Sequence, residues 1–394
     1  MAYPQASYRK PIRVAFLTTV IPVARRSGGE IAAMAFIEAL QNAGHDVQVA
    51  GWLPPDAEEP DAGWVHAAGH RHIETAEAPA TAKAAWLARA FAQGLPYSVA
   101  KYAGRRYDRA AAAARDGADL VVVNSAQAPA AVPEDRPFVH IEFNVEHDLY
   151  AAAAQRATRA PARRLLRREA RLVERVERRL SDGARAVWCL TEADAARFSE
   201  LGARAAPVFP VPGRTPAHVD AGGVRDGVAL IGNWTWEPNA VGLRWFAAQV
   251  VPLLDRSLSV EVAGAGSEHA LAEQPETGLR LHGRVPDADR FLAGARVVAV
   301  PAMAGGGIQV KTLDAIAAGA WVVTTPMGVR GLDDLPPSVR VESEPERFAA
   351  AIAELERAPE SASPSAEGID WSRRRAERFT AMVSDEAAAA LGRG

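Results

Sequence analysis

The chain has 394 residues, of which 48% are hydrophobic and 24% charged, with a formal net charge of −3 at pH 7. This is the profile of a globular protein of about two ordinary domains, and a charge so near neutral gives no support for a nucleic-acid partner held by bulk electrostatics. A single cysteine, Cys189, leaves no disulfide framework and favours a reducing, cytoplasmic setting, and no stretch approaches the roughly 20 apolar residues of a membrane span.

The first elements predict a Rossmann-like domain. Residues 12–18 form a short apolar run typical of a buried strand, and Gly28 and Gly29 follow it. Residues 30–43 have apolar positions at helical spacing, and residues 47–52 predict the next strand. A strand, a glycine loop, a helix and a strand in this order open such domains.

The glycine loop has two interpretations. Gly28 and Gly29 could simply begin the helix, or their amides could face the phosphates of a ligand. Arg25 and Arg26, which precede them, could be solvated loop charges or could bind an anionic group.

The pattern predicts three further strands in this half, residues 119–124, 137–141 and 186–190. Polar side chains follow the second of them. Glu142, Asn144, Glu146 and His147 come directly after strand 137–141, at the end where open α/β sheets place their ligands. Glu146 and His147 are therefore candidate catalytic residues near a reacting group. The alternative for His147 is an ordinary surface histidine.

Residues 156–179 hold ten arginines against three glutamates, with a helical seam of leucine and valine. Such a helix is usually a solvated face, since arginine is a strong helix former. It could also dock on anionic lipid.

Prolines and glycines cluster just after residue 206 and predict a linker at 210–227. A second series of strands and helices begins at residue 228, and two helices at about 344–357 and 370–391 end the chain. Gly232 and Asn233 follow the first strand of this series, and Arg284 follows a later one.

The segment 297–325 carries the most specific pattern. An apolar strand leads into Gly305, Gly306 and Gly307, where a helix is predicted to begin. The first turn of a helix leaves amides unpaired at the positive end of its dipole, and glycines let a diphosphate approach them. Lys311 could meet the same charge, and Asp314, pointing the same way, could accept from ribose hydroxyls. A plain tight connection is the alternative, but charges on an otherwise apolar helix need partners.

This segment resembles the nucleotide-sugar site of GT-B glycosyltransferases, in particular the retaining family 4 group. Asp314-Ala-Ile-Ala matches the second acidic position of the family pattern, and Gly305 to Ile308 with Lys311 resembles a Gly-Gly-Gly-Ile…Lys branch. The first acidic position is Gly306 here, a departure that bears on donor choice and catalysis. The Arg/Lys pair that many members place after the first strand of the second domain is also missing. Residues 142–147 resemble a family loop usually written His-Asn-x-Glu.

The resemblance implies an α/β GT-B fold, with two Rossmann-like domains facing each other across a cleft. Residues 1–209 would form the acceptor-side domain, 228–370 the nucleotide-sugar domain, and 371–394 a helix that packs back on the first domain. The implied donor-binding residues are Gly28, Gly29, Gly232, Asn233, Arg284, Gly305, Gly306, Gly307, Ile308, Lys311 and Asp314, and Glu146 and His147 would lie near the reacting sugar.

The implied activity is retaining transfer from a nucleotide diphosphate sugar to a hydroxyl acceptor, without metal or cofactor. We expect a glycan or lipid-linked acceptor from bacterial polysaccharide or glycoconjugate synthesis, no nucleic acid, and a cytoplasmic location. Helix 156–179 leaves peripheral contact with the inner face of the membrane open. A sugar-nucleotide epimerase and a non-catalytic nucleotide-binding or partner protein on a decayed GT-B scaffold are the alternatives.

Overall fold

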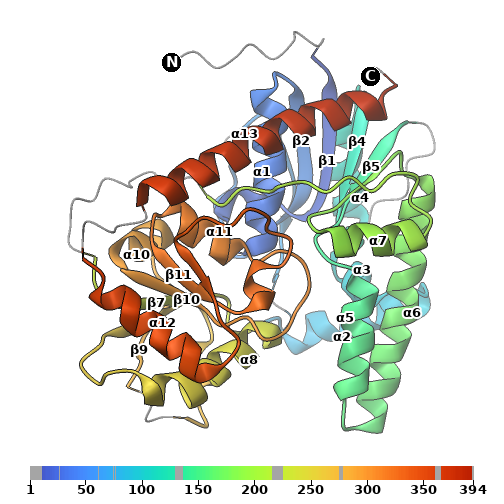
Figure 1. Ribbon diagram of the computed structural model, residues 1–394. Helices are drawn as coiled ribbons and strands as arrows, with labels where there is room; N and C mark the ends of the chain where they lie inside the picture. Colours follow the sequence, from blue (N-terminus) through green and yellow to red (C-terminus); the bar gives the residue numbers. More distant parts are fainter. Residues whose placement is uncertain are drawn as a thin grey trace. The chain divides into compact units, whose positions relative to one another are not determined.

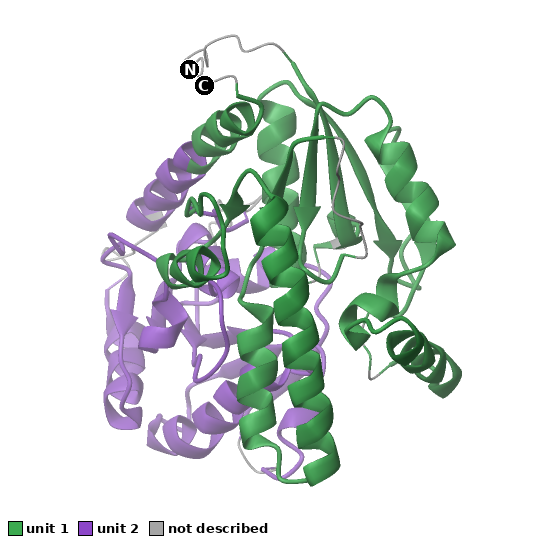
Figure 2. Ribbon diagram, turned by 90° about the vertical axis from the view of Figure 1, so that its right-hand side faces the viewer, with its two compact units in different colours: residues 1–209, 379–394 green, residues 210–378 purple. Residues whose placement is uncertain are grey.

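The computed structural model describes residues 11–25, 27–60, 62–73, 75, 77–128, 136–214, 225–274, 278–359 and 365–392. The chain divides into two compact units, unit 1 with residues 1–209 and 379–394 and unit 2 with residues 210–378 (Figure 2). Residues 215–224 of the predicted linker lie outside the described residues. Each unit contains a six-stranded sheet in which neighbouring strands are parallel (Figure 1).

In unit 1 the strand order is β3-β2-β1-β4-β5-β6. The strands are β1 (Arg13–Val20), β2 (Asp46–Leu53), β3 (Val65–His70), β4 (Leu120–Asn124), β5 (Phe138–Ile141) and β6 (Val187–Trp188). The order reverses direction between β1 and β4, and this is the point at which open α/β sheets bind ligands at the carboxyl ends of their strands. The sequence predicted these strands except β3.

The helices of unit 1 are α1 (Gly28–Asn42), α2 (Ala80–Ala92), α3 (Tyr97–Tyr102), α4 (Arg105–Arg115), α5 (Glu146–Arg156), α6 (Ala160–Gly183) and α7 (Glu192–Glu200). Helix α1 begins at Gly28 because Ser27 caps it: the Ser27 hydroxyl accepts from the Glu30 amide at 3.2 Å and donates to the Glu30 carboxylate at 3.2 Å. Helices α5 and α6 lie side by side and form a long hairpin (Figures 1 and 2).

The last helix, α13 (Ser365–Ala390), is continuous, and from Phe379 onward it belongs to unit 1. There the Phe379 ring lies 4.8 Å from that of Phe36 on α1 and 6.2 Å from that of Phe209, measured between centroids. The Trp188 ring completes this buried aromatic cluster, 5.7 Å from Phe36. The end of the chain is thus part of the core of unit 1.

Unit 2 repeats the topology with the order β12-β11-β10-β7-β8-β9. Its strands are β7 (Val228–Ile231), β8 (Val260–Ala263), β9 (Arg280–Gly283), β10 (Val297–Val300), β11 (Trp321–Thr324) and β12 (Val339–Val341). Its helices include α8 (Glu237–Trp245), α9 (Ser267–Ala270), α10 (Ala288–Gly294), α11 (Val310–Ala317) and α12 (Pro345–Arg357). All four residues of β10 are buried, so helices cover both faces of the sheet there. The order reverses between β7 and β10.

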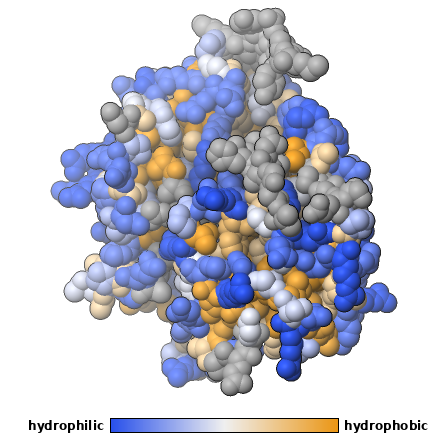
Figure 3. Space-filling view, turned by 90° about the vertical axis from the view of Figure 1, so that its left-hand side faces the viewer, coloured by the Kyte–Doolittle hydropathy of each residue, from blue (hydrophilic) through white to orange (hydrophobic). Residues whose placement is uncertain are grey.

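Polar and apolar surface alternate on the face shown in Figure 3, with apolar atoms gathered in its lower half. Large exposed apolar side chains of unit 2 include Leu253 and Met303, which are 50% and 41% exposed.

Helix α8 approaches the end of β10 so closely that only glycine fits at residue 242. A Cβ added to Gly242 would lie 1.9 Å from the carbonyl oxygen of Pro301. This contact is between two backbones, so no side-chain rotation relieves it. It places the loop after β7 beside the glycine loop after β10.

We expect Gly242→Ala to destabilise the protein by roughly 1–3 kcal/mol, because the backbones of α8 and residue 301 must separate. Gly294→Ala is the matched control: this helical glycine has nothing within 4 Å of an added Cβ, so alanine should be neutral or stabilise slightly. Urea unfolding of both variants measures the difference. Equal stability of the two would show that the close approach imposes no constraint.

Candidate functional site

The glycine loop of unit 2 follows β10 and precedes α11. Gly305 has φ 113° and Gly307 has φ 64°, values that favour glycine. The sequence predicted that the helix begins at these glycines, and this is wrong: α11 begins at Val310, and Ile308 lies in the loop. Two positive φ angles break the helical path, so the turn needs extra residues before α11 starts. Gln309, the N-cap residue, makes no side-chain cap hydrogen bond to the first amides of α11.

Lys311 meets the loop after β7. Its Nζ donates to Oδ1 of Asn239 at 2.8 Å, and Nδ2 of Asn239 donates to the carbonyl oxygen of Asn233 at 2.9 Å. The Lys311 Nζ also lies 5.6 Å from the ring centroid of Trp234, whose Nε1 donates to the carbonyl of Ala263. Asn239 therefore links Lys311 to the backbone of Asn233. The sequence analysis missed Asn239 as the link, although this polar residue lies in the first turn of α8, directly after Pro238.

The lysine lacks a carboxylate partner within the part of the chain that the structure describes. Burial lowers the pKa of Lys311 from about 10.5 to about 8. An amide oxygen and a ring face stabilise a cation less than a carboxylate does. The site thus holds a partly desolvated positive charge that an anionic ligand would stabilise.

Asp314 does not point to the same partners as Lys311. Its Oδ1 accepts from the Arg214 amide at 2.8 Å, and its Oδ2 accepts from Nε and Nη2 of Arg214 at 3.1 and 3.0 Å. Burial raises the pKa of Asp314, and the Arg214 charge opposes that shift. The sequence prediction of a carboxylate open to ribose needs correction: in this structure both oxygens are already bound.

Asp314 is bound in this way because of the path that the chain takes just before β7. A Cβ on Gly213 would lie 2.5 Å from the carbonyl carbon of Leu313, so residues 213 and 214 run directly against α11. Arg214 also pairs with Asp289 on α10 at 3.2 Å. No spacing rule could place Arg214 here, since 100 residues separate it from Asp314.

The remaining predicted donor-binding residues of unit 2 have plainer surroundings. Gly232 lies against Gly264, where an added Cβ would be 1.7 Å from the Gly232 carbonyl oxygen. Arg284 is exposed and follows the edge strand β9, and none of the contacts of the described residues joins it to Lys311. Gly306 is half-buried and lies between the two glycines with positive φ.

In unit 1 the start of α1 meets the loop after β5. A Cβ on Gly29 would lie 3.7 Å from the Phe143 ring, so Gly28 and Gly29 are brought near residues 142–147. Arg25 pairs with Glu38, and Arg26 lies outside the described residues.

Three glutamates are placed around the start of α5. Glu142 is 1% exposed, and its Oε2 accepts from the Ala126 amide at 2.5 Å. Glu146 accepts from Nε2 of Gln127 at 3.2 Å, and its amide donates to Oε1 of Glu177 at 2.7 Å. Burial, with the charges of Glu142 and Glu177, raises the pKa of Glu146 to about 8.

His147 is 7% exposed, so its interpretation as a surface histidine is wrong. Its Nδ1 lies 2.5 Å from Oε2 of Glu177, and its Nε2 lies 3.2 Å from both Asp148 and Arg197. Burial lowers the pKa of His147, but the hydrogen bond and charge of Glu177, with Asp148, outweigh burial and leave it raised. Both ring nitrogens are engaged within unit 1.

The sequence analysis missed Glu177, the residue that organises this cluster. It lies on the arginine-rich helix α6 and is fully buried. A signal was present: Glu169 and Glu177 interrupt the apolar seam of that helix, on the face opposite most arginines. Buried carboxylates need partners, so their position on the seam predicts buried hydrogen bonds.

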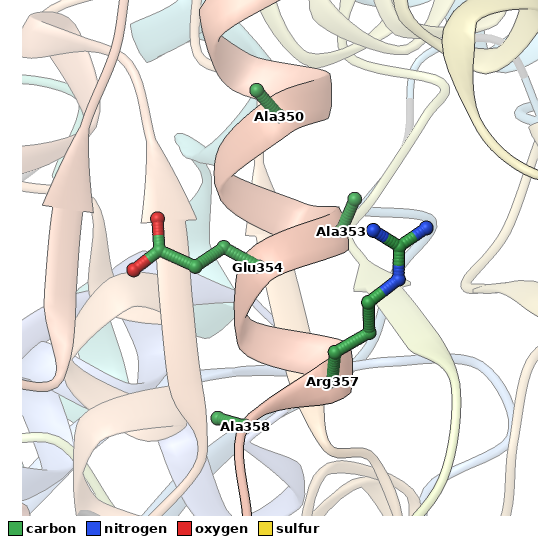
Figure 4. Close-up of a pocket in the computed structure, with 5 residues that line it drawn as sticks. All are labelled: Ala350, Ala353, Glu354, Arg357 and Ala358. Atoms are coloured by element: carbon green, nitrogen blue, oxygen red, sulfur yellow. The ribbon is translucent and has the colours of Figure 1, made fainter.

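A shallow depression on α12 lies elsewhere, lined by Ala350, Ala353, Glu354, Arg357 and Ala358 (Figure 4). Its charged side chains project from different sides of one helix, and it contains none of the predicted site residues.

Among the described residues, no group of three or more His, Cys, Asp or Glu side chains is arranged to hold a metal ion. None of the helices that the structure describes has the length and apolar character required to cross a bilayer.

Comparison with known proteins identifies the family. The model of the family described as glycosyl transferases group 1 matches residues 225–357, and that of the glycosyl transferase 4-like domain matches residues 27–213. No curated protein matches the sequence.

Solved structures resemble the whole chain. HepE of Anabaena, determined in complex with UDP and glucose, has 13% identity and a TM-score of 0.60, covering 97% of this chain and 99% of its own. WaaG, a glycosyltransferase involved in lipopolysaccharide biosynthesis, has 15% identity and a TM-score of 0.58, with coverages of 95% and 99%. The α,α-trehalose 6-phosphate synthase of Burkholderia multivorans has 14% identity and a TM-score of 0.58, with 98% of each chain covered.

At these identities the solved structures establish the fold, and the two family models establish the class of enzyme. The chain belongs to the group 1 glycosyltransferases of the GT-B fold.

Proposed function

We propose that this glycosyltransferase moves a hexose from UDP-hexose to a hydroxyl acceptor with retention of configuration. The observation that carries the proposal is the Lys311 cation, held between Asn239 and the Trp234 ring beside the start of α11. Uridine is the proposed base because HepE was determined with UDP-glucose and a related synthase is described as UDP-forming.

The chemistry follows from where charge develops. Departure of the sugar leaves negative charge on the diphosphate, and groups fixed in advance around that charge lower the barrier. Lys311, the Gly305–Gly307 backbone and the first amides of α11 are the groups we assign to this task. These positive groups belong to the chain itself, so we propose that transfer proceeds without a metal.

The Arg214 pair limits what Asp314 can contribute. We propose that the ribose is held by the loop after β7, through Asn233, for as long as Asp314 remains bound to Arg214. Glu146 and His147 of unit 1 are assigned to the sugar or acceptor side. The acceptor we propose is a glycan or lipid-linked saccharide of bacterial polysaccharide synthesis.

Helix α6 supports a proposed peripheral contact with anionic lipid. Arg164, Arg167 and Arg171 are exposed on one side of it, and Leu165 at its border is 42% exposed. Phe91 of α2 is 58% exposed, with the Arg168 guanidinium 4.4 Å from its ring centroid. Cations around exposed apolar side chains fit the headgroup region of an anionic bilayer.

Nucleotide binding tests the proposed donor site. In a thermal-shift panel of UDP, GDP, CDP, dTDP and ADP, we expect UDP to stabilise the wild type by about 2.7 kcal/mol at a hundredfold excess over Kd. Lys311→Ala should lose most of that shift, and Lys83→Ala, on α2 of unit 1, should keep it. A full shift in Lys311→Ala, or no shift with any nucleotide, would overturn the assignment of Lys311 to the diphosphate.

The unliganded protein should gain stability when the Lys311 charge is removed. The pKa of Lys311 falls to about 8 on folding, so the unfolded chain binds more protons between about pH 8 and 10.5, and stability rises with pH through that window. Below it, burial of the cation is unfavourable, and Lys311→Met should stabilise the protein by about 1–3 kcal/mol at pH 7. The advantage should shrink by pH 10. Urea unfolding at the two pH values measures it, and a Lys311→Met protein less stable at pH 7 would contradict the expectation.

Vesicle sedimentation tests the lipid contact. With about 0.1 M salt, wild type should bind vesicles that contain phosphatidylglycerol, and the triple change Arg164→Glu, Arg167→Glu, Arg171→Glu should reduce binding at least about tenfold. A matched triple on α13, Arg373→Glu, Arg374→Glu, Arg378→Glu, serves as the control. Equal vesicle binding by the two triple variants would show that α6 is not the membrane contact.

A further inference from the structure

The three glutamates around the start of α5 differ in how many hydrogen-bond donors they receive. Glu177 accepts from the Glu146 amide at 2.7 Å and from His147 Nδ1 at 2.5 Å. Glu142 accepts from the Ala126 amide at 2.5 Å and the Phe143 amide at 3.4 Å, with Nε2 of His140 3.4 Å away. Glu146 receives one donor among the described residues, the Gln127 amide at 3.2 Å.

This unequal distribution decides which carboxyl group carries a proton. Hydrogen bonds to a carboxylate favour its charged form. Burial raises the pKa of Glu177, and the hydrogen bonds from His147 and from the Glu146 amide oppose that shift. Two neighbouring anions disfavour a third. Glu146, with one neutral donor, is therefore the member of the cluster that takes the proton.

We propose that Glu146 is a neutral carboxylic acid at neutral pH that donates a hydrogen bond to an oxygen of the sugar or the acceptor. Gln127 donates to Oε2, which places the proton on Oε1. Glu177 is the positioning residue that holds this acid in place. The inference rests on the proposed glycosyl transfer for its substrate and on the geometry of unit 1 for the acid itself.

Glu177 holds the backbone at the start of α5 in addition to contributing negative charge beside Glu146. Val145 precedes α5 without a side-chain cap, and the Glu177 carboxylate accepts from the first amide of α5 instead. The same carboxylate binds His147 Nδ1 and so fixes the imidazole. One buried side chain from α6 thereby sets the start of α5 and the direction of Glu146.

The charged groups around Glu146 agree with this assignment. Burial is the main cause that raises its pKa to about 8, followed by the charges of Glu142 at the end of β5 and Glu177 on α6, while Gln127 lowers it. Tyr150, one turn later on α5, has its own pKa raised to about 12 by burial first and then by the Glu146 charge. His147 faces Glu177, Asp148 and Arg197.

Infrared titration of the unliganded full chain tests the proton directly. The wild type should show the carbonyl stretch of a protonated carboxyl group at pH 7 that disappears near pH 8 and is missing in Glu146→Gln. Glu177→Gln removes a neighbouring anion and should move that titration down by about one pH unit or more. A wild-type spectrum without this signal, or one unchanged by Glu146→Gln, would overturn the inference.

Two further variants serve as controls for the infrared titration. Glu169→Gln removes another buried glutamate of α6, which accepts from the Tyr97 amide at 2.6 Å, and should leave the titration in place. If Glu177→Gln does not fold, Glu142→Gln removes the other neighbouring anion and should lower the same titration. An unchanged titration in the folded variant would show that the neighbouring charges do not raise the pKa of Glu146, and this would overturn the inference.

Turnover measurements distinguish a neutral Glu146 that donates a hydrogen bond from an ionised Glu146 that acts as a base. With water as acceptor and UDP-glucose at saturation, so that the bound diphosphate keeps Lys311 protonated, wild-type UDP release should fall as the pH rises through about 8, and Glu146→Gln, whose amide also donates, should not show that fall. Glu146→Ala should be at least about tenfold slower than Glu146→Gln at pH 7. A Glu146→Gln protein as slow as Glu146→Ala would instead support a base. The infrared signal needs no nucleotide, and the thermal-shift panel does not depend on Glu146, so the inference and the proposed function can fail separately.

Discussion

Charge held out of water at the carboxyl ends of parallel strands is the constraint on which the rest of this molecule depends. Strand order reverses once in each sheet, and at that point the following helices diverge and leave strand ends accessible. In unit 2 this position holds a lysine whose partners among the described residues, Asn239 and the Trp234 ring, are neutral. In unit 1 three buried or half-buried glutamates lie around the end of β5, the strand next to β4. Each arrangement takes ionisable groups out of water, which is unfavourable for folding.

Backbone contacts that leave no room for a side chain hold the loops around these groups in place. Helix α8 lies against residue 301, and residue 264 lies against the carbonyl of Gly232, so the loops around Lys311 are fixed by main-chain packing. Arg214 fixes the chain before unit 2 on α11 in the same way, through a buried pair with Asp314. A site built on such contacts is organised before its ligand arrives, which lowers the ordering entropy of binding.

Local patterns predicted most of the elements, because apolar runs and helical spacing report burial directly. They placed the strands of both sheets apart from β3 and β12, and they placed Lys311 beside the glycine loop. They did not place Arg214 against Asp314, because a contact over 100 residues depends on the path of the whole chain. Glu177 was missed for a different reason. The ten arginines of residues 156–179 dominate the composition of that helix, and the two glutamates on its apolar seam become informative only when each position is assigned to a face.

Helix α13 has a consequence for synthesis. Phe379 belongs to the aromatic cluster of unit 1, together with Phe36, Trp188 and Phe209. A ribosome makes the other three rings long before this one, and the whole of unit 2 is translated in between. The nascent N-terminal unit must therefore wait with an incomplete core while the second unit is made, although domains usually fold in order as they emerge. Completion of the first half of this protein is among the last events of its translation.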